Sequence, residues 1–349
     1  MRLGLNLGYW GAGNDADNLE LAREADRLGY AVVWAAEAYG SDAATVLAWV
    51  AAQTERIDVG SAVFQIPGRT PANTAMTAAT LDTLSGGRFR LGLGVSGPQV
   101  SEGWHGVRFD KPLARTREYV DVVRLALSRR KVQYDGEFFT LPLPDGPGKA
   151  LVLTVHPVRE QIPIYLAAIG PKNLELTGEI ADGWLAIFFA PEHADELTSH
   201  VAAGRAKVGK TLEGFDVVPT VPVVFGDDVA ACADPLRAYC SLYIGGMGSR
   251  EKNFYNQLAS RMGYEAAAAE VQDKYLARDY DGAGAAVPFE FIDRTALIGP
   301  RERVQERLHA YAAAGVTTLS VATYAPTLDE RLTTLRTMAE ILDASGLGD

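Results

Sequence analysis

Short apolar runs alternate with longer amphipathic stretches along most of the chain. The short runs are apolar on both faces, as in strands of a sheet that helices cover, and most are followed by a turn and a stretch of helical periodicity. Strands are predicted at 3–7, 31–34, 57–63, 89–94, 164–167, 184–188, 217–224 and 318–322. Helices are predicted at 16–28, 43–53, 71–84, 111–129, 172–181, 192–208, 229–241 and 328–344. This alternation makes the sheet parallel.

Eight such strands predict a closed (β/α)8 TIM barrel, an α/β fold, in a single domain over residues 1–349. The chain is longer than the roughly 250 residues of a typical barrel. The Pro- and Gly-rich segment 131–162 and the segment 246–296 are interpreted as insertions at the C-terminal face. A doubly wound open sheet is the alternative, but the stretch LGYWGAGND after the first strand lacks its usual G-x-G-x-x-G spacing.

Composition narrows the classes of function. The formal net charge of -11 argues against broad nucleic-acid binding, which needs a basic surface. The two cysteines, Cys232 and Cys240, support neither a disulfide framework nor a cysteine metal site, and the five histidines show no clustered metal-binding spacing. No apolar run approaches the ~20 residues of a membrane span. We therefore expect a cytoplasmic protein with no membrane, nucleic-acid or metal partner.

The most suggestive short motif is Gly170-Pro171, which stands between an apolar run and a predicted helix. Proline is favoured at the first position of a helix, and the free amides that follow it, around Lys172, are suited to binding a phosphate. Gly170 would let such a ligand approach the backbone, and Lys172 would add charge. The alternative is that the pair only starts the helix.

Other candidate residues also follow predicted strands, where barrels bind their ligands. Glu37 comes two residues after an apolar strand, so its carboxylate must be paired, solvated or functional. Arg69 precedes a helix and is either a ligand contact or a pairing residue. The stretch LGLGVSGPQVSEGWHG has small residues where a flat ring could lie close to the backbone, and Trp104 and His105 could cover it.

Taken together, these stretches resemble the bacterial luciferase-like superfamily, and within it the coenzyme F420-dependent oxidoreductases of the methylene-tetrahydromethanopterin reductase branch. The resemblance spans nearly the whole chain and rests on WAAEAYGSDAATVLA, on SGGRF followed by LGLG, on GPKNLELTGEIADGWL and on IGPRERVQERLHAYAAAGVTTLSV. It implies a hydride-transferring enzyme that binds the deazaflavin F420. The alternatives are an FMN-dependent monooxygenase served by a flavin reductase, and a flavin-binding protein without activity.

The resemblance also implies particular site residues. The ring is expected against a non-prolyl cis peptide at Ala62-Val63, with Glu37 as the acidic residue near it. The ring or its side chain is expected along Gly94, Val95, Ser96 and Gly97, and the phosphate at Ala168, Ile169, Gly170, Pro171 and Lys172.

Departures from the family pattern bear on the reaction. Several F420-dependent relatives carry Asp-His where this chain has Glu37-Ala38, so the usual proton-transferring histidine is missing. This favours reduction of a C=C, C=N or C=O bond of a small organic substrate. Glu37, Tyr9 and His105 are the candidates for protonation, in that order. Because the family often forms dimers, a homodimer is expected.

Overall fold

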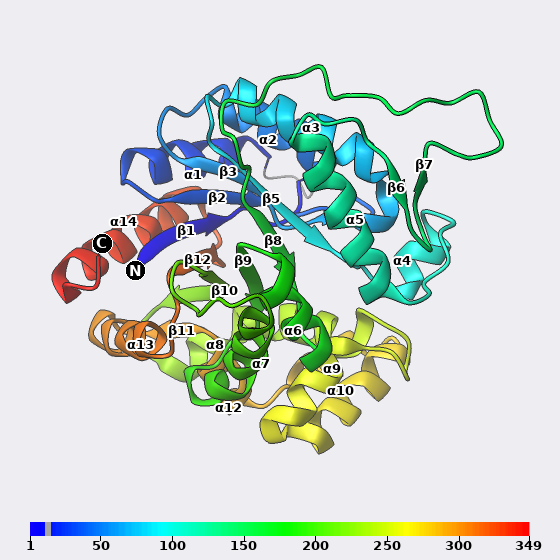
Figure 1. The fold of residues 1–349 in the computed structure, drawn as a ribbon. Helices are drawn as coiled ribbons and strands as arrows, with labels where there is room; N and C mark the ends of the chain where they lie inside the picture. The colour runs from blue at the N-terminus through cyan, green and yellow to red at the C-terminus, as the bar shows by residue number, and fades with distance from the viewer. Residues whose placement is uncertain (11–14, 349) are drawn as a thin grey trace.

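The computed structural model describes residues 1–10 and 15–348, and eight parallel strands in it close into a barrel (Figure 1). Around the barrel the strands follow the order β12-β1-β2-β3-β5-β8-β9-β10, and β10 pairs in turn with β12. Their bounds are β1 Arg2–Asn6, β2 Val32–Ala35, β3 Asp58–Ser61, β5 Phe89–Gly94, β8 Ile164–Ala167, β9 Gly183–Ile187, β10 Asp216–Phe225 and β12 Thr318–Thr323. The predicted TIM barrel is confirmed.

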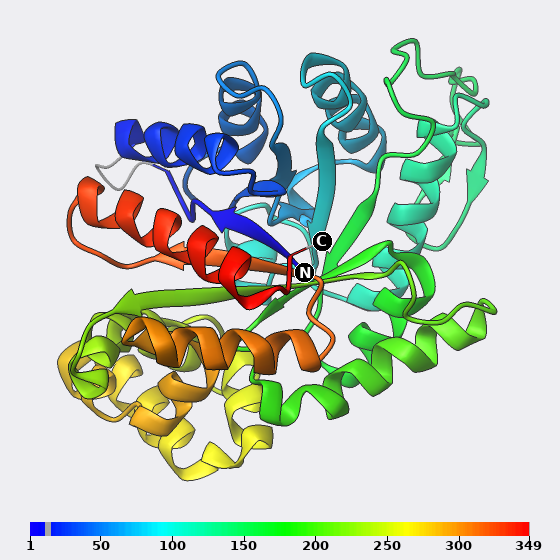
Figure 2. The same ribbon diagram turned by 90° about the vertical axis from the view of Figure 1, so that its left-hand side faces the viewer.

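With the exception of α13, the helices that cover the barrel begin and end close to the predicted residues. They are α1 Asp15–Arg27, α2 Ala43–Ala51, α3 Pro71–Leu84, α5 Pro112–Leu127, α6 Pro171–Ile180, α7 Ala194–Lys207, α13 Arg301–Ala313 and α14 Leu328–Ser345. Helix α13 is absent from the prediction, which assigned the helix after the seventh strand to 229–241. Figure 2 shows α13 beside α14 in the outer layer, and its Tyr311 donates a hydrogen bond to the Phe189 carbonyl at 3.1 Å.

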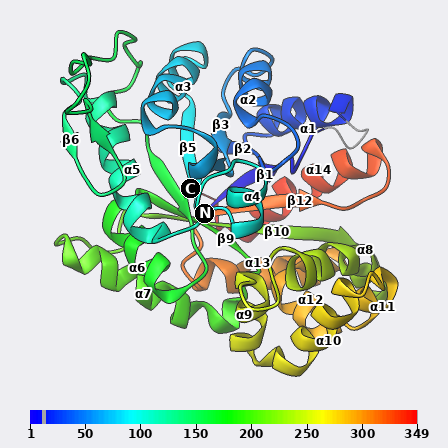
Figure 3. The ribbon, with the colours of Figure 1, turned by 90° about the vertical axis from the view of Figure 1, so that its right-hand side faces the viewer.

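The segment 246–296 lies at the C-terminal end of the barrel, as predicted. It follows α8 (Val229–Ser241) and a π-helical turn, Leu242–Gly246, and contains α9 Phe254–Ala259, α10 Glu265–Leu276, α11 Tyr280–Ala285 and α12 Phe289–Thr295. The short strand β11 (Leu297–Gly299) then pairs with the end of β10. Figure 3 shows these helices gathered where β10 points. Helix α8, predicted as part of the regular alternation, therefore belongs to this elaboration of the mouth.

The segment 131–162 differs from the prediction, because it lies along the outside of α5 instead of over the mouth (Figure 1). Its hairpin pairs β6 (Tyr134–Asp135) with β7 (Thr140–Leu141), and Glu118 of α5 accepts hydrogen bonds from three hairpin amides. Its far end is tied to the end of α3, where Arg159 donates to the buried carboxylate of Asp82 at 2.8 Å.

The barrel interior is filled towards its N-terminal end. Arg90 of β5 forms ion pairs with Asp58 and Asp216, at 2.7 and 3.1 Å, and donates to the hydroxyl of Tyr165 at 3.2 Å. Above this network lies the fully buried ring of Trp34, and a Cβ on Gly60 would come within 2.3 Å of it. A ligand therefore has access only from the C-terminal end.

Candidate active site at the barrel mouth

The strand order places the predicted cofactor-binding segments side by side. They follow β2, β3, β5 and β8, which are consecutive in the barrel, so they occupy one half of its mouth. The other half is formed by the segments after β9, β10, β12 and β1. We call these the β2–β8 half and the β9–β1 half.

The peptide bond between Ala62 and Val63 is cis, as the family resemblance implied. Both residues are partly exposed, whereas Ser61 before them and Phe64 after them are fully buried. The Ser61 hydroxyl fixes the neighbouring strand, because it donates to the Gly92 carbonyl at 2.8 Å and accepts from the Gly92 amide at 2.9 Å. The Ala62-Val63 peptide is therefore accessible at the mouth, and the buried residues on either side of it hold it in place.

The segment Gly94 to Gly97 continues that surface after β5. A Cβ on Gly94 would lie 2.5 Å from Cγ2 of Val63, so glycine is required for the two segments to approach. Ser96 has φ +61°, a left-handed conformation that turns the chain into the short helix α4 (Pro98–Gly103), with Gly97 at its N-cap. Small side chains and a turned backbone leave room here for a flat group.

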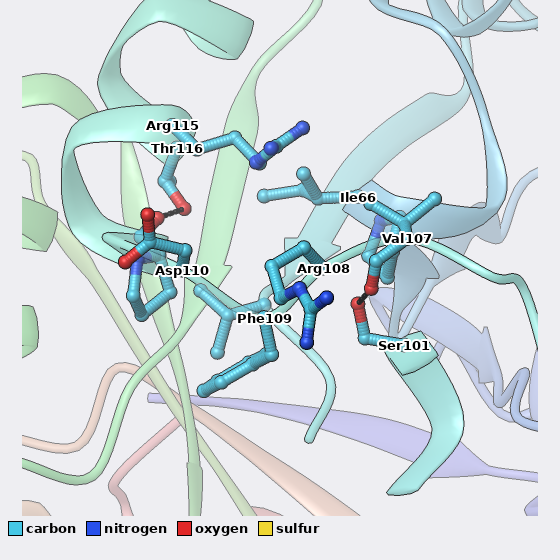
Figure 4. A pocket seen from close by; sticks show the side chains of 11 residues that line it. Ile66, Ser101, Val107, Arg108, Phe109, Asp110, Arg115 and Thr116 are labelled. Atoms are coloured by element: carbon cyan, nitrogen blue, oxygen red, sulfur yellow. Dashed lines mark hydrogen bonds between the residues drawn. The ribbon is translucent and has the colours of Figure 1, made fainter. Parts of the chain in front are cut away.

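A small apolar cavity borders this segment on its outer side (Figure 4). Val95 and Ile66 contribute to one wall, and Phe109 comes from the connection between α4 and α5. The connection is held by paired hydrogen bonds between Ser101 and Val107, at 2.7 and 2.8 Å. Because Arg115 and Thr116 of α5 close the other side, the cavity belongs to the packing of this connection.

The turn between β8 and α6 is held through its carbonyl groups. Asn173 Nδ2 donates to the Ala167 carbonyl at 3.3 Å, Trp184 Nε1 to Ala168 at 2.9 Å, and an Arg261 guanidinium nitrogen to Ile169 at 3.0 Å. The turn is thus fixed from three sides before the helix begins at Pro171.

The start of α6 has the features expected of an anion site. Gly170 is the N-cap and supplies no side chain, so the first amides of the helix, including those of Lys172 and Asn173, remain available. A Cβ built on Gly170 meets no atom within 4 Å, so open space adjoins it. The positive end of the helix dipole favours an anion here.

Arg261 is a residue of this site that the sequence analysis did not identify. It lies in the mouth segment, 91 residues after Gly170, and only the fold brings it to the start of α6. Its Nε is buried and has no hydrogen-bond partner, and its nearest carboxylate oxygen, on Glu196, is 3.8 Å away. A positively charged guanidinium therefore stands at the turn that the sequence predicted to hold a phosphate.

Glu37 is held by neighbouring groups. Its carboxylate forms an ion pair with Arg69 and accepts the amide hydrogen of Ala43, at the start of α2, at 3.0 Å. Arg69 also pairs with Asp42, and its guanidinium lies 4.4 Å from the ring centre of Phe64. These contacts favour the pairing interpretation of Arg69 and leave Glu37 few free lone pairs for proton transfer.

His105 is connected to Glu37 through Gln65. The ring Nε2 lies 2.7 Å from Gln65 Oε1, and Gln65 Nε2 donates to the Glu37 carbonyl at 2.9 Å. A Cβ on Gly68 would come within 3.0 Å of the imidazole, which therefore packs closely on the chain after β4 (Phe64–Gln65). Two of the three candidate proton donors thus share one network, while the indole of Trp104 remains exposed.

Tyr9, the third candidate, belongs to the β9–β1 half. It forms a side-chain hydrogen bond with Tyr243, and partial burial raises its pKa. Around this pair lie Tyr239, Tyr255, Tyr324 and Phe188, with ring-centre separations of 4.8–5.8 Å between neighbours. We call these six residues the aromatic wall. It was not predicted, because its members come from five separate parts of the chain.

Other classes of site find no support in residues 1–10 and 15–348. No group of three His, Cys, Asp or Glu side chains in these ranges could hold a metal ion. In the same ranges no helix is sufficiently long and apolar to cross a membrane. Cys232 and Cys240 are free thiols and are buried.

This chain is similar to known proteins over most of its length. The family of luciferase-like monooxygenases matches residues 8–318. A Mycobacterium tuberculosis protein, named by inference as a coenzyme F420-dependent oxidoreductase, is 45% identical over 328 residues, which cover 92% of this chain and 94% of that protein. The 5,10-methylenetetrahydromethanopterin reductase of Archaeoglobus fulgidus is 29% identical over 297 residues, 84% of this chain and 85% of the reductase.

A solved structure shares the fold. The coenzyme F420-dependent tetrahydromethanopterin reductase of Methanopyrus kandleri superposes with a TM-score of 0.82 over 97% of each chain, at 22% sequence identity. At that level of identity the superposition shows that the two proteins share a fold.

Proposed function

Because the chain belongs to the family of luciferase-like monooxygenases, we propose that it is an F420-dependent oxidoreductase that reduces a small organic substrate. The observation that carries the proposal is the 45% identity to a relative whose name specifies coenzyme F420, over nearly the full length of both chains. The more distant reductase relative has a name that describes reduction of a methylene group on a pterin carrier.

The β2–β8 half fits the two chemical parts of such a cofactor. Its phosphate matches the free amides at the start of α6, where open space adjoins Gly170, and the guanidinium of Arg261, which is hydrogen-bonded to the Ile169 carbonyl of the same turn. Its flat ring matches the partly exposed backbone at Ala62-Val63 and the segment Gly94 to Gly97. When bound, the reduced deazaflavin supplies a hydride.

The reductive direction is supported by the state of the possible bases. Oxidation of an alcohol requires a group that removes the hydroxyl proton. Glu37 is paired with Arg69, and His105 is hydrogen-bonded to Gln65. Ala38 stands where the family resemblance leads us to expect the histidine that several F420-dependent relatives carry. Reduction needs only a proton donor, a role open to the tyrosine hydroxyls of the aromatic wall or to water.

The test is a titration of the purified protein with F420 and, separately, with FMN, followed by fluorescence and calorimetry. Binding of F420 at micromolar concentrations or below, with FMN at least tenfold weaker, is the expected result. A preference for FMN, together with oxygen consumption when reduced FMN is supplied, would overturn the proposal and indicate a monooxygenase.

We also propose that the protein works as a homodimer in the cytoplasm. Large apolar side chains stand exposed on adjacent helices, Trp49 on α2 and Met76 on α3. Light scattering coupled to gel filtration checks the assembly, with twice the chain mass of 37.5 kDa as the expected value.

A further inference from the structure

The aromatic wall has no assigned role in cofactor binding, and it stands on the opposite half of the mouth. Tyr9, Phe188 and Tyr324 follow the ends of β1, β9 and β12, while Tyr239, Tyr243 and Tyr255 come from α8 and the elements after it. Phe188 contacts Tyr239, Tyr243 and Tyr255 at ring-centre distances of 5.4, 5.8 and 6.4 Å. The wall is therefore continuous across that half.

Several hydroxyl groups of the wall are unused. Within the described part of the chain, the hydroxyls of Tyr239, Tyr255 and Tyr324 have no hydrogen-bond partner, yet none is sealed from solvent. An unpaired hydroxyl beside partly buried rings is costly unless it bonds to water or to a ligand. The wall thus offers flat apolar faces together with free donors.

The wall is also uncharged. Its six members are five tyrosines and one phenylalanine, and burial raises the pKa of Tyr255 and Tyr324. Burial likewise raises the pKa of Tyr239 and Tyr243 well above that of free tyrosine. The hydroxyls therefore remain neutral donors. Phe188, at one edge of the wall, lines a small pocket with Arg261 and Glu196, but these two side chains form an ion pair at 3.8 Å, and the proposed function assigns the Arg261 guanidinium to the cofactor phosphate.

From these observations we propose that the aromatic wall selects a neutral, planar, unsaturated carbonyl compound as substrate. The substrate's ring or double bond stacks on the tyrosine faces, and a wall hydroxyl donates to its carbonyl oxygen. This inference rests on the proposed function, because it names the substrate class of the same site. It sets the chain apart from its more distant relatives named as acting on glucose 6-phosphate, an anion.

The hydride acceptor follows from this arrangement. In an α,β-unsaturated ketone, hydride delivered by the reduced deazaflavin forms a new C–H bond at the β carbon, and the C=C electron pair moves to an enolate. The hydride carries the two electrons that reduce the substrate, and a bound, reduced deazaflavin would supply them. A proton from water or a tyrosine hydroxyl completes the α C–H bond, and solvent returns the proton to the tyrosine. A hydrogen bond to the carbonyl oxygen stabilises the enolate.

The test uses a matched pair of probes, trans-4-phenyl-3-buten-2-one and trans-cinnamate. The two molecules have the same unsaturated skeleton, but the methyl group of the ketone is replaced by a charged carboxylate oxygen in cinnamate. Calorimetric titrations measure the binding of each probe to the protein loaded with oxidised F420 and to the cofactor-free protein. We expect the ketone to bind at least tenfold more tightly than the anion, because no charge in the wall offsets desolvation of a carboxylate. Equal binding, tighter cinnamate binding, or no binding of either probe would overturn the proposal.

Two variants test the wall directly, and a third serves as the control. Tyr255→Leu, which removes a ring, is expected to weaken ketone binding five- to tenfold, and Tyr324→Arg to bring cinnamate to parity with the ketone or beyond it. The control, Tyr280→Leu, changes a tyrosine that is 54% exposed and contacts Tyr275 outside the wall, so its affinities should stay at the wild-type values. Thermal melts confirm folding of each variant.

Measuring the affinity for F420 distinguishes a failure of the substrate proposal from a failure of the proposed F420-dependent function. All three variants should bind F420 within twofold of the wild type, because the changes lie outside the β2–β8 half. If wild-type protein fails to bind F420, the proposed function fails. If F420 binds but the two wall variants leave the probe preference unchanged, the inference about the substrate fails alone.

Discussion

The substitution Gly170→Val tests whether the turn before α6 is a phosphate site or only the start of a helix. Gly170 has φ -81° and ψ 150°, an extended conformation that valine adopts readily, and a Cβ there meets nothing within 4 Å. Loss of a glycine N-cap costs up to about 1 kcal/mol. Restricting the unfolded chain returns about 0.4–1 kcal/mol. The fold should therefore be almost unaffected.

The effect on a bound phosphate is expected to be much larger. The valine methyl groups would occupy the space beside the free amides, and each hydrogen bond to a charged group contributes about 1.5–3 kcal/mol. Loss of one such bond corresponds to a rise in Kd of roughly 10–100-fold, since about 1.4 kcal/mol is a factor of ten. The Gly170→Val variant should therefore lose affinity for F420 while its thermal stability stays close to that of the wild type.

The assay combines calorimetric titration with F420 and a thermal melt. The control is Gly146→Val, in the outer segment 131–162, where an added Cβ meets only one atom, at 3.9 Å. Both variants should melt within about 2–4 °C of the wild type, the shift that corresponds to about 1 kcal/mol in a chain of this order of size. An unchanged F420 Kd in a stable Gly170→Val protein would refute the reasoning and leave Gly170-Pro171 as a helix start.

Three further substitutions test Arg261, Glu37 and, away from the site, an ion-pair cluster on α1. Arg261→Gln should raise the Kd for F420 at least tenfold but leave binding of a phosphate-free deazaflavin unchanged; equal losses for both ligands would contradict a phosphate contact. Glu37→Gln should lower the melting temperature by about 2–6 °C, because it breaks a largely buried ion pair; lost turnover without lost stability would instead assign it a chemical role. Glu24 accepts hydrogen bonds from Arg27 and Arg336, which outweigh its partial burial and lower its pKa from 4.5 to about 2. Its stabilisation should be complete above pH 4.5 and disappear as the pH falls towards 2, so Glu24→Gln should cost roughly 1 kcal/mol at pH 7, after solvent screening, and nothing near pH 2 in denaturant titrations.

Much of the fold was predictable because its signals are local. Strand and helix periodicity along the chain indicated all eight barrel strands and most covering helices, since burial on two faces or on one stripe leaves a direct trace in the order of residues. Helix α13 was missed because the long mouth segment interrupts the alternation, and α8 took its place in the count. The position of 131–162 outside α5 depends on long-range contacts such as the one between Arg159 and Asp82. No local sequence pattern predicts such contacts.

The candidate site likewise combines features that the sequence indicated with features that depend on the fold. The sequence indicated Gly170-Pro171 as an anion site and Ala62-Val63 as the cis peptide, the first from helix-start chemistry and the second from family resemblance. Their position on one half of the mouth, with the aromatic wall opposite, follows from the closed strand order.

Tertiary structure alone brought Arg261 to the turn after β8, and it alone gathered Tyr9, Tyr243 and Tyr324 into one wall. The physical reason is distance along the chain. A hydrophobic period or a helix cap involves residues a few positions apart, whereas a guanidinium that reaches a carbonyl 92 residues away depends on the path of every element between them.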